Sequence, residues 1–115
     1  MSQVRVIRDA DMAWQEPPDA WPGKAKPGEP SVSHKTVLRA GPDRPNMQRV
    51  RYDPNRFEPP HSHPEDEVIY MLSGTLAFGD QILCNGDVLF VPKDARYSLR
   101  AGEAGAEFIR VGMPA

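Results

Sequence analysis

The sequence has few of the features that mark secreted or membrane proteins. It contains a single cysteine, Cys84, so no disulfide can form within one chain, and the fold does not depend on an oxidising compartment. No apolar run approaches the roughly 20 residues that a membrane helix needs. The first residues, MSQVRVIRDAD, lack the apolar core of a signal peptide. We therefore expect a cytoplasmic protein without a membrane partner.

An excess of charge of either sign is also absent. The chain has 14 Lys and Arg against 16 Asp and Glu, a formal net charge of −2. Nucleic-acid binding needs a concentration of basic side chains to neutralise phosphates, and the sequence has neither a basic patch nor a helix-turn-helix pattern. We expect no nucleic-acid partner. With 115 residues, 39% of them apolar, the chain is long enough for one compact domain.

Proline, by contrast, is abundant in the first half. Ten of the 13 prolines lie between Pro17 and Pro60. Because proline fixes φ and removes a backbone donor, we expect turns and edge strands there. The stretch PPDAWPGKAKPGEP, residues 17–30, cannot sustain a helix or a central strand. It predicts an extended arm anchored by Trp14 and Trp21, with partial disorder as the alternative.

We divide the chain into an N-terminal extension, residues 1–32, and a barrel, residues 33–113. The extension is expected to wrap the barrel or to pair in a dimer. Within it, Val4–Arg8 alternates and predicts a short edge strand. Asp9 is expected to cap a helical turn over residues 9–14.

After Ser33, short strands alternate with turn signals. We expect strands at residues 35–39, 47–52, 67–72, 75–78, 81–84, 88–91, 97–100 and 106–111. Gly79-Asp80 and Asn85-Gly86 predict hairpin turns, Ser73-Gly74 predicts a turn, and residues 101–105 predict a loop. Many short strands at this spacing, with almost no helix, predict an all-β sandwich or barrel, and closure would remove exposed edges.

The predicted core consists of apolar residues on these strands. They are Ile69, Met71, Leu76, Phe78, Ile82, Leu83, Val88, Leu89, Phe90, Val91, Leu99, Phe108 and Ile109. Cys84 is expected to be a small core residue as well. Some of these side chains should line a pocket for a small apolar or aromatic molecule.

The motif HSHPEDE, residues 61–67, concentrates groups that bind metals. On a strand, residues two apart share a face, so His61 and His63 should project together. Glu67 opens the next strand and faces the same interior if the two strands are antiparallel neighbours. Two imidazoles and one carboxylate with open positions suit Fe(II), Mn(II), Zn(II), Ni(II) or Cu(II).

The same motif has a second interpretation without a metal, in which the acidic run is a solvated turn that caps a strand. In both interpretations we expect Glu65 and Asp66 to be solvated. If the register slips by one residue, Asp66 replaces Glu67 as the ligand.

At these residues the sequence resembles the cupins, whose first motif is G-x5-H-x-H-x3/4-E-x6-G. His61, His63, Glu67 and Gly74 match it residue by residue, and Asn55 stands where the opening glycine is expected. Asparagine is the common substitute where a positive φ is needed.

The second cupin motif, G-x5-P-x-G-x2-H-x3-N, is matched less well. Gly86 and Pro92 fit, and Asp94 replaces the second glycine, where it can still adopt the left-handed turn. Tyr97 replaces the histidine that normally supplies the fourth ligand, and Arg100 lies near the asparagine position.

The resemblance, which covers Tyr52 to Val111, implies a double-stranded β-helical (jelly-roll) barrel, commonly a homodimer. It also implies one divalent transition metal held by His61, His63 and Glu67. It does not supply a fourth histidine ligand.

Further residues have several interpretations. Tyr97 is a candidate Fe(III) ligand, a candidate catalytic acid or hydrogen-bond donor, or a filler of the barrel mouth. His34 is either the missing ligand or a surface residue. Four arginines on or near strands are candidates to pair with a substrate carboxylate, or else lie on solvated outer faces: Arg49, Arg51, Arg96 and Arg100.

These features favour a metal-dependent enzyme acting on a small organic molecule. Non-haem iron dioxygenase-like chemistry suits two histidines and one carboxylate, and isomerase, lyase or cyclase chemistry is the variant. The alternative is a non-catalytic cupin that binds or senses a metabolite or metal. A degenerate cupin without metal is the third hypothesis.

Overall fold

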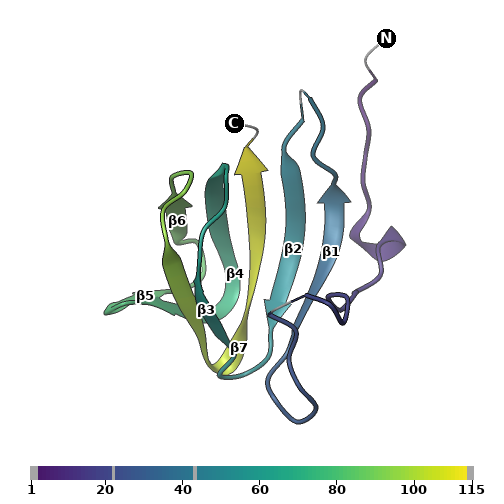
Figure 1. Ribbon diagram of the computed structural model, residues 1–115. Coiled ribbons are helices and arrows are strands. Elements are labelled where there is room, and N and C mark those ends of the chain that lie inside the picture. The colour runs from purple at the N-terminus through teal and green to yellow at the C-terminus, as the bar shows by residue number, and fades with distance from the viewer. Residues whose placement is uncertain (1–2, 22, 43, 114–115) are drawn as a thin grey trace.

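The computed structural model describes residues 3–21, 23–42 and 44–113, and in these ranges the chain is almost entirely β-structure (Figure 1). Met1, Ser2 and Pro22 of the predicted arm lie outside the described residues. The elements are the 3-10 turn η1 (Asp9–Asp11) and the strands β1 (Val32–Leu38), β2 (Asn46–Tyr52), β3 (Phe57–His61), β4 (Asp66–Phe78), β5 (Gln81–Leu83), β6 (Val88–Val91) and β7 (Tyr97–Met113). No helix in the described part of the chain is long and apolar enough to cross a bilayer.

Two long strands, β4 and β7, hold the barrel together. The first part of β7 pairs with β3 and with the end of β4, and its second part pairs with β2 and with the beginning of β4. Figure 1 shows β7 turning at the lower end of the barrel and rising again towards the C-terminus. Every strand pair is antiparallel. The predicted all-β jelly-roll barrel is confirmed.

The predicted breaks at residues 73–74 and 101–105 are wrong, because β4 and β7 each run through as one strand. The register between them shifts where Gly74 pairs with Ala106 and Leu76 pairs with Ala101, and residues 102–105 lie in this bulge. Gly74 (φ 70°) and Gly105 (φ 78°) adopt positive φ values. A Cβ on Gly74 would collide with the carbonyl oxygen of Gly105. Glycine therefore lets β4 and β7 bend against each other at close range instead of ending, and four predicted strands are two.

The predicted hairpin at Asn85-Gly86 is also wrong. A turn is present, since the N–H of Asp87 donates to the carbonyl of Cys84 at 2.9 Å. However, β5 and β6 do not pair with each other. β5 pairs with the end of β4, and β6 pairs with its beginning. The turn redirects the chain along β4.

The strand expected to carry both His61 and His63 beside that of Glu67 is wrong, because β3 ends at His61 and is not paired with β4 in the described residues. β3 has the sequence FEPPH. Its two prolines lack backbone donors, which excludes them from a central strand. β3 pairs with β7 alone, so it is an edge strand, where proline is tolerated.

The core lies between the two walls of the barrel. Ile69 and Met71 of β4 are buried as predicted, together with Leu76, Leu83, Val91, Leu99 and Phe108. Four predicted core residues are instead exposed on outer faces, because strand alternation points them away from the interior: Phe78, Ile82, Val88 and Phe90. Cys84 is exposed too, and its thiol donates to Asp87 Oδ2 at 3.4 Å.

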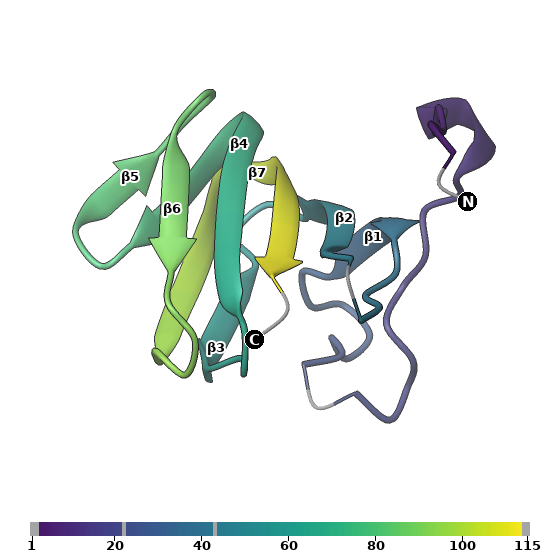
Figure 2. The same ribbon diagram turned by 90° about the horizontal axis from the view of Figure 1, so that it is seen from above.

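The N-terminal arm lies outside β1 (Figure 2). Residues 3–8 form no strand, so the predicted edge strand is wrong. Asp9 is part of η1 and does not cap it, because its carboxylate accepts hydrogen bonds from Lys35 and Arg49, each at 3.1 Å. Trp14 stacks under Arg51, 4.1 Å from ring centre to Cζ, and Trp21 packs against the core. The two tryptophans anchor the arm as predicted.

Candidate active site

A cavity of about 710 Å³ opens inside the barrel. This volume lies in the range of pockets that hold small molecules. Pro17, Pro18 and Trp21 of the arm line one side of it, and His34, His61 and His63 all line it as well. The three histidines of the chain therefore face one space.

His61 ends β3 and lies opposite Tyr97 of β7. Its Nδ1 lies 2.8 Å from the carbonyl oxygen of Pro59. A carbonyl can only accept, so Nδ1 carries the proton and Nε2 keeps its lone pair. Metal-binding histidines use this arrangement to fix the tautomer and the ring orientation.

His63 follows β3 in the turn that leads to β4, and this turn is fixed by the second motif. The N–H of Asp94 donates to the carbonyl of His63 at 2.7 Å. Asp94 has φ 65°, the left-handed conformation expected where it replaces glycine, and Asn55 has φ 64°. The rings of His61 and His63 are 4.9 Å apart between centroids. Burial lowers the pKa of His63, with Glu67 opposing the shift, and therefore favours the neutral imidazole.

Glu67 has no exposed surface and shares the inner face of β4 with Ile69 and Met71. One carboxylate oxygen accepts a hydrogen bond from the Tyr97 hydroxyl, and the other accepts one from Arg110 Nε. His63 Nε2 lies 3.8 Å from Glu67 Oε2. Burial and the nearby Glu67 carboxylate raise the pKa of Tyr97, so the phenol stays protonated at neutral pH. This environment disfavours a phenolate ligand.

Arg110 is the charged group that sequence reasoning missed. It lies on the inner face of β7, two residues beyond the buried Phe108, and its Nη2 donates to Glu65 Oε1 at 2.7 Å. Gly112 leaves the space that the Glu65 carboxylate occupies. Glu65 is therefore an ion-pair partner and not a solvated residue. Alternation counted from Phe108 was the available signal.

The other predicted candidates lie apart from this cluster. His34 is half-buried on β1 beside Gln15 of the arm, and burial lowers its pKa. Asp66 is exposed and accepts a hydrogen bond from the N–H of Lys93 at 2.9 Å. Arg49 pairs with Glu107 at 2.6 Å, and Arg100 stacks on Phe57. The cavity is not lined by any of the four arginines that the sequence singled out.

His61, His63 and Glu67 offer two imidazole nitrogen donors and one carboxylate, a donor set that fits a divalent transition metal. A carboxylate has about four lone-pair sites, so Tyr97 and Arg110 leave capacity on Glu67. In the geometry shown, no group of three or more His, Cys, Asp or Glu side chains in the described ranges is already gathered at ligand distances. Binding would require these side chains to draw together.

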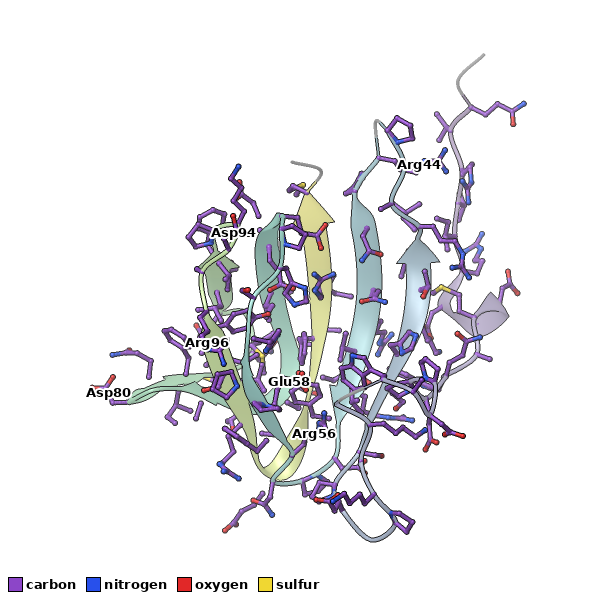
Figure 3. The ribbon with its side chains drawn as sticks, in the orientation of Figure 1. Arg44, Arg56, Glu58, Asp80, Asp94 and Arg96 are labelled. Atoms are coloured by element: carbon purple, nitrogen blue, oxygen red, sulfur yellow. The ribbon has the colours of Figure 1, made fainter. Side chains whose placement is uncertain are left out.

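A second pair that sequence reasoning missed lies at the start of β3. Arg56 and Glu58 are both buried, and Arg56 Nη2 donates to Glu58 Oε2 at 2.8 Å (Figure 3). Burial, followed by the charge of Glu58, raises the pKa of the neighbouring Tyr52. Both residues fall in the turn and the proline-rich strand where the sequence gives little periodicity.

Several solved structures share this fold. KdgF from Halomonas sp. is 19% identical with a TM-score of 0.76, over 98% of this chain and 96% of that one. The polyketide cyclase RemF from Streptomyces resistomycificus is 21% identical with a TM-score of 0.73, over 96% and 79%. A putative acetylacetone dioxygenase from Methylibium petroleiphilum is 10% identical with a TM-score of 0.77, over 97% and 78%. These likenesses show the fold alone.

The sequence itself matches a family model. No curated protein sequence gives a significant match. The model of the cupin domain, Cupin_2, matches residues 48–111, which include both motifs and more than half of the chain. The chain belongs to the cupin family.

Proposed function

We propose that this cupin is a metal-dependent enzyme that acts on a small organic molecule bound in the cavity. His61 and His63 are the nitrogen ligands, and Glu67 is the oxygen ligand. The observation that carries the proposal is the arrangement of His61. Its Nδ1 is engaged by the Pro59 carbonyl, which leaves Nε2 free, its ring lies 4.9 Å from that of His63, and the Glu67 carboxylate is buried.

Each neighbouring side chain has a role that follows from its contacts. The Tyr97 hydroxyl holds Glu67 in place and is a protonated hydrogen-bond donor at the cavity wall. Arg110 pairs with both Glu67 and Glu65 and offsets one of their two negative charges, which lowers the cost of burying Glu67. The apolar wall that includes Ile69 and Leu99 limits water around the substrate.

A bound metal supplies Lewis acidity or, with iron, oxygen activation. We favour dioxygenase-like chemistry, and isomerase, cyclase or lyase chemistry is the variant within the same class. Structures with this fold include a polyketide cyclase and a putative acetylacetone dioxygenase, which is compatible with either variant. The identity of the metal separates them.

A non-catalytic cupin that binds or senses a metabolite is the second candidate. It is favoured by the network of Glu67, Tyr97 and Arg110, because both carboxylate oxygens already have donors. A buried polar network that is satisfied without a metal needs no metal for stability.

Metal content tests the first proposal. We expect near-stoichiometric metal by inductively coupled plasma mass spectrometry on protein purified without an affinity tag, or after reconstitution with Fe(II), Mn(II), Ni(II), Zn(II) or Cu(II). The variant His61→Ala/His63→Ala should lose it. His34→Gln is the matched control, since His34 lines the same cavity outside the proposed ligand set, and it should retain the metal.

Iron in the protein would direct the next assay to O₂ uptake, and zinc would direct it to isomerase and cyclase substrates. If the wild-type protein takes up none of these ions, the metal-dependent proposal is wrong and the binding function remains. Retention of metal by the double variant would show that the ligands were assigned incorrectly.

A further inference from the structure

The cavity has a second polar end that the proposed metal centre does not use. Glu58 lies opposite Leu99 of β7, whereas His61 lies opposite Tyr97, two residues earlier on the same strand. Figure 3 shows Glu58 towards the lower end of the strands and Asp94, whose N–H donates to the His63 carbonyl, at the upper end. The cavity therefore runs from a histidine end to a Glu58 end.

Glu58 is buried, and Arg56 holds its carboxylate in place. Its residue exposure is 8%, and its Oε2 accepts from Arg56 Nη2. The same Nη2 donates to the Gly23 carbonyl of the arm at 2.8 Å, so Arg56 ties the carboxylate to two parts of the structure. In the described ranges, the bond from Arg56 is the one hydrogen bond that the Glu58 carboxylate accepts, and it uses Oε2 and not Oε1.

Oε1 of Glu58 is not among the fully buried atoms that lack a partner, so it keeps accessible surface and can accept a hydrogen bond from a partner outside the chain. Glu58 is among the residues that line the cavity, so a molecule in the cavity can supply that partner. Arg56 already balances the charge, and the missing partner therefore need not be a cation. A neutral hydroxyl group satisfies the Oε1 acceptor.

The region between the two ends is apolar. Val50, Leu99 and Phe108 line it and are themselves buried. Because Tyr97 and Leu99 are two residues apart on β7, the two polar ends are about 7 Å apart along the strand. This separation suits a single ring between two polar substituents.

We propose that Glu58 determines specificity for small cyclic alcohols or phenols whose hydroxyl group donates to Oε1. The opposite substituent then faces His61 and His63. The inference rests on the proposed function for its reaction, because it names the substrate class of the same cavity. Binding of the ring, however, needs no metal.

Three matched probes test the proposal: 4-hydroxyacetophenone, 4-methoxyacetophenone and acetophenone. The first can donate a hydrogen bond from its ring substituent, and the others cannot. We would measure their dissociation constants by NMR titration of isotopically labelled full-length protein, after removal of metal with EDTA. We expect 4-hydroxyacetophenone to bind at least about tenfold more tightly than the methoxy compound, about 1.4 kcal/mol.

Glu58→Gln should reduce this preference to less than about threefold, because the amide weakens the acceptor. The substitution keeps the size of the side chain and an oxygen for Arg56. Glu103→Gln is the matched control, an identical change at an exposed position of β7, and it should keep the full preference. Circular dichroism establishes that each variant is folded.

The preference of the wild-type protein tests the proposal even if Glu58→Gln does not fold. Equal binding of the hydroxy and methoxy compounds, or binding of neither, would overturn it, and so would an unchanged preference in folded Glu58→Gln. A hydroxyl preference in a protein that binds no metal would leave this inference standing while the proposed reaction fails.

Discussion

At the scale of single residues, burial governs the ionisation of His34. The pKa of His34 is lowered by desolvation, whereas in the unfolded chain His34 titrates near the ordinary histidine value of about 6.5. The unfolded chain therefore binds more protons than the folded one as the pH falls below about 6.5. Stability rises with pH wherever the unfolded state binds more protons, so protonation of His34 destabilises the fold at acid pH.

We expect His34→Gln to make the free energy of unfolding less dependent on pH between about pH 7.5 and 5. Urea denaturation at a series of pH values, with EDTA present, measures the slope. His63 also has a lowered pKa, so the variant should keep part of the dependence. Identical slopes for wild type and variant would contradict the effect of burial on His34.

The sequence predicted the residues of the motif better than their partners. His63 and Glu67 are close because only three residues separate them, and His61 lies beside His63 at the end of β3, which pairs with β7. Arg110 and Glu58 were not predicted, since each reaches the cavity through pairings with strands distant in sequence. Alternation from Phe108 could place Arg110 on the inner face, but its pairing with Glu67 depends on the register of the whole barrel, which local periodicity does not contain.

At the scale of elements, the bends of β4 and β7 depend on glycines that touch. A residue other than glycine at position 74 is strained at φ 70° and would also collide with the carbonyl of Gly105. The sequence indicated a turn here from Ser73-Gly74. It could not indicate that pairing continues, because the close contact involves Gly105, 31 residues later in the sequence.

Gly74→Ala should lower the free energy of unfolding by about 3 kcal/mol or more, combining backbone strain with a steric clash. Gly79→Ala is the matched control. Gly79 also has a positive φ, 59°, but a Cβ there would meet nothing within 4 Å, so about 1 kcal/mol is expected. Urea denaturation of both variants measures the difference. Equal losses would show that the contact with Gly105 contributes nothing.

At the scale of the whole molecule, the outer face of β4 and β6 is apolar. Tyr70, Val88 and Phe90 are 44%, 56% and 58% exposed. The register places Tyr70 beside Val88, and Val68 beside Phe90, so these side chains form one continuous patch, the β4–β6 face. Contiguous exposed apolar surface of this kind marks interaction sites. A second copy of the chain presents a patch of the same chemistry.

We expect the β4–β6 face to be buried in a homodimer, the oligomeric state that the resemblance to cupins implied. Size-exclusion chromatography with light scattering should give twice the monomer mass of 12.8 kDa, and Phe90→Lys should shift the protein to the monomer. Ile82→Lys is the matched control, because Ile82 is 62% exposed but lies on β5, which pairs with the other end of β4. The Ile82→Lys variant should stay dimeric. A charge at the centre of an apolar interface costs several kcal/mol, enough to dissociate a small dimer, whereas the same charge on β5 costs nothing at the interface.

A wild-type mass of 12.8 kDa would mean that the patch has another partner or none. Loss of the dimer in both variants would place the interface outside the β4–β6 face.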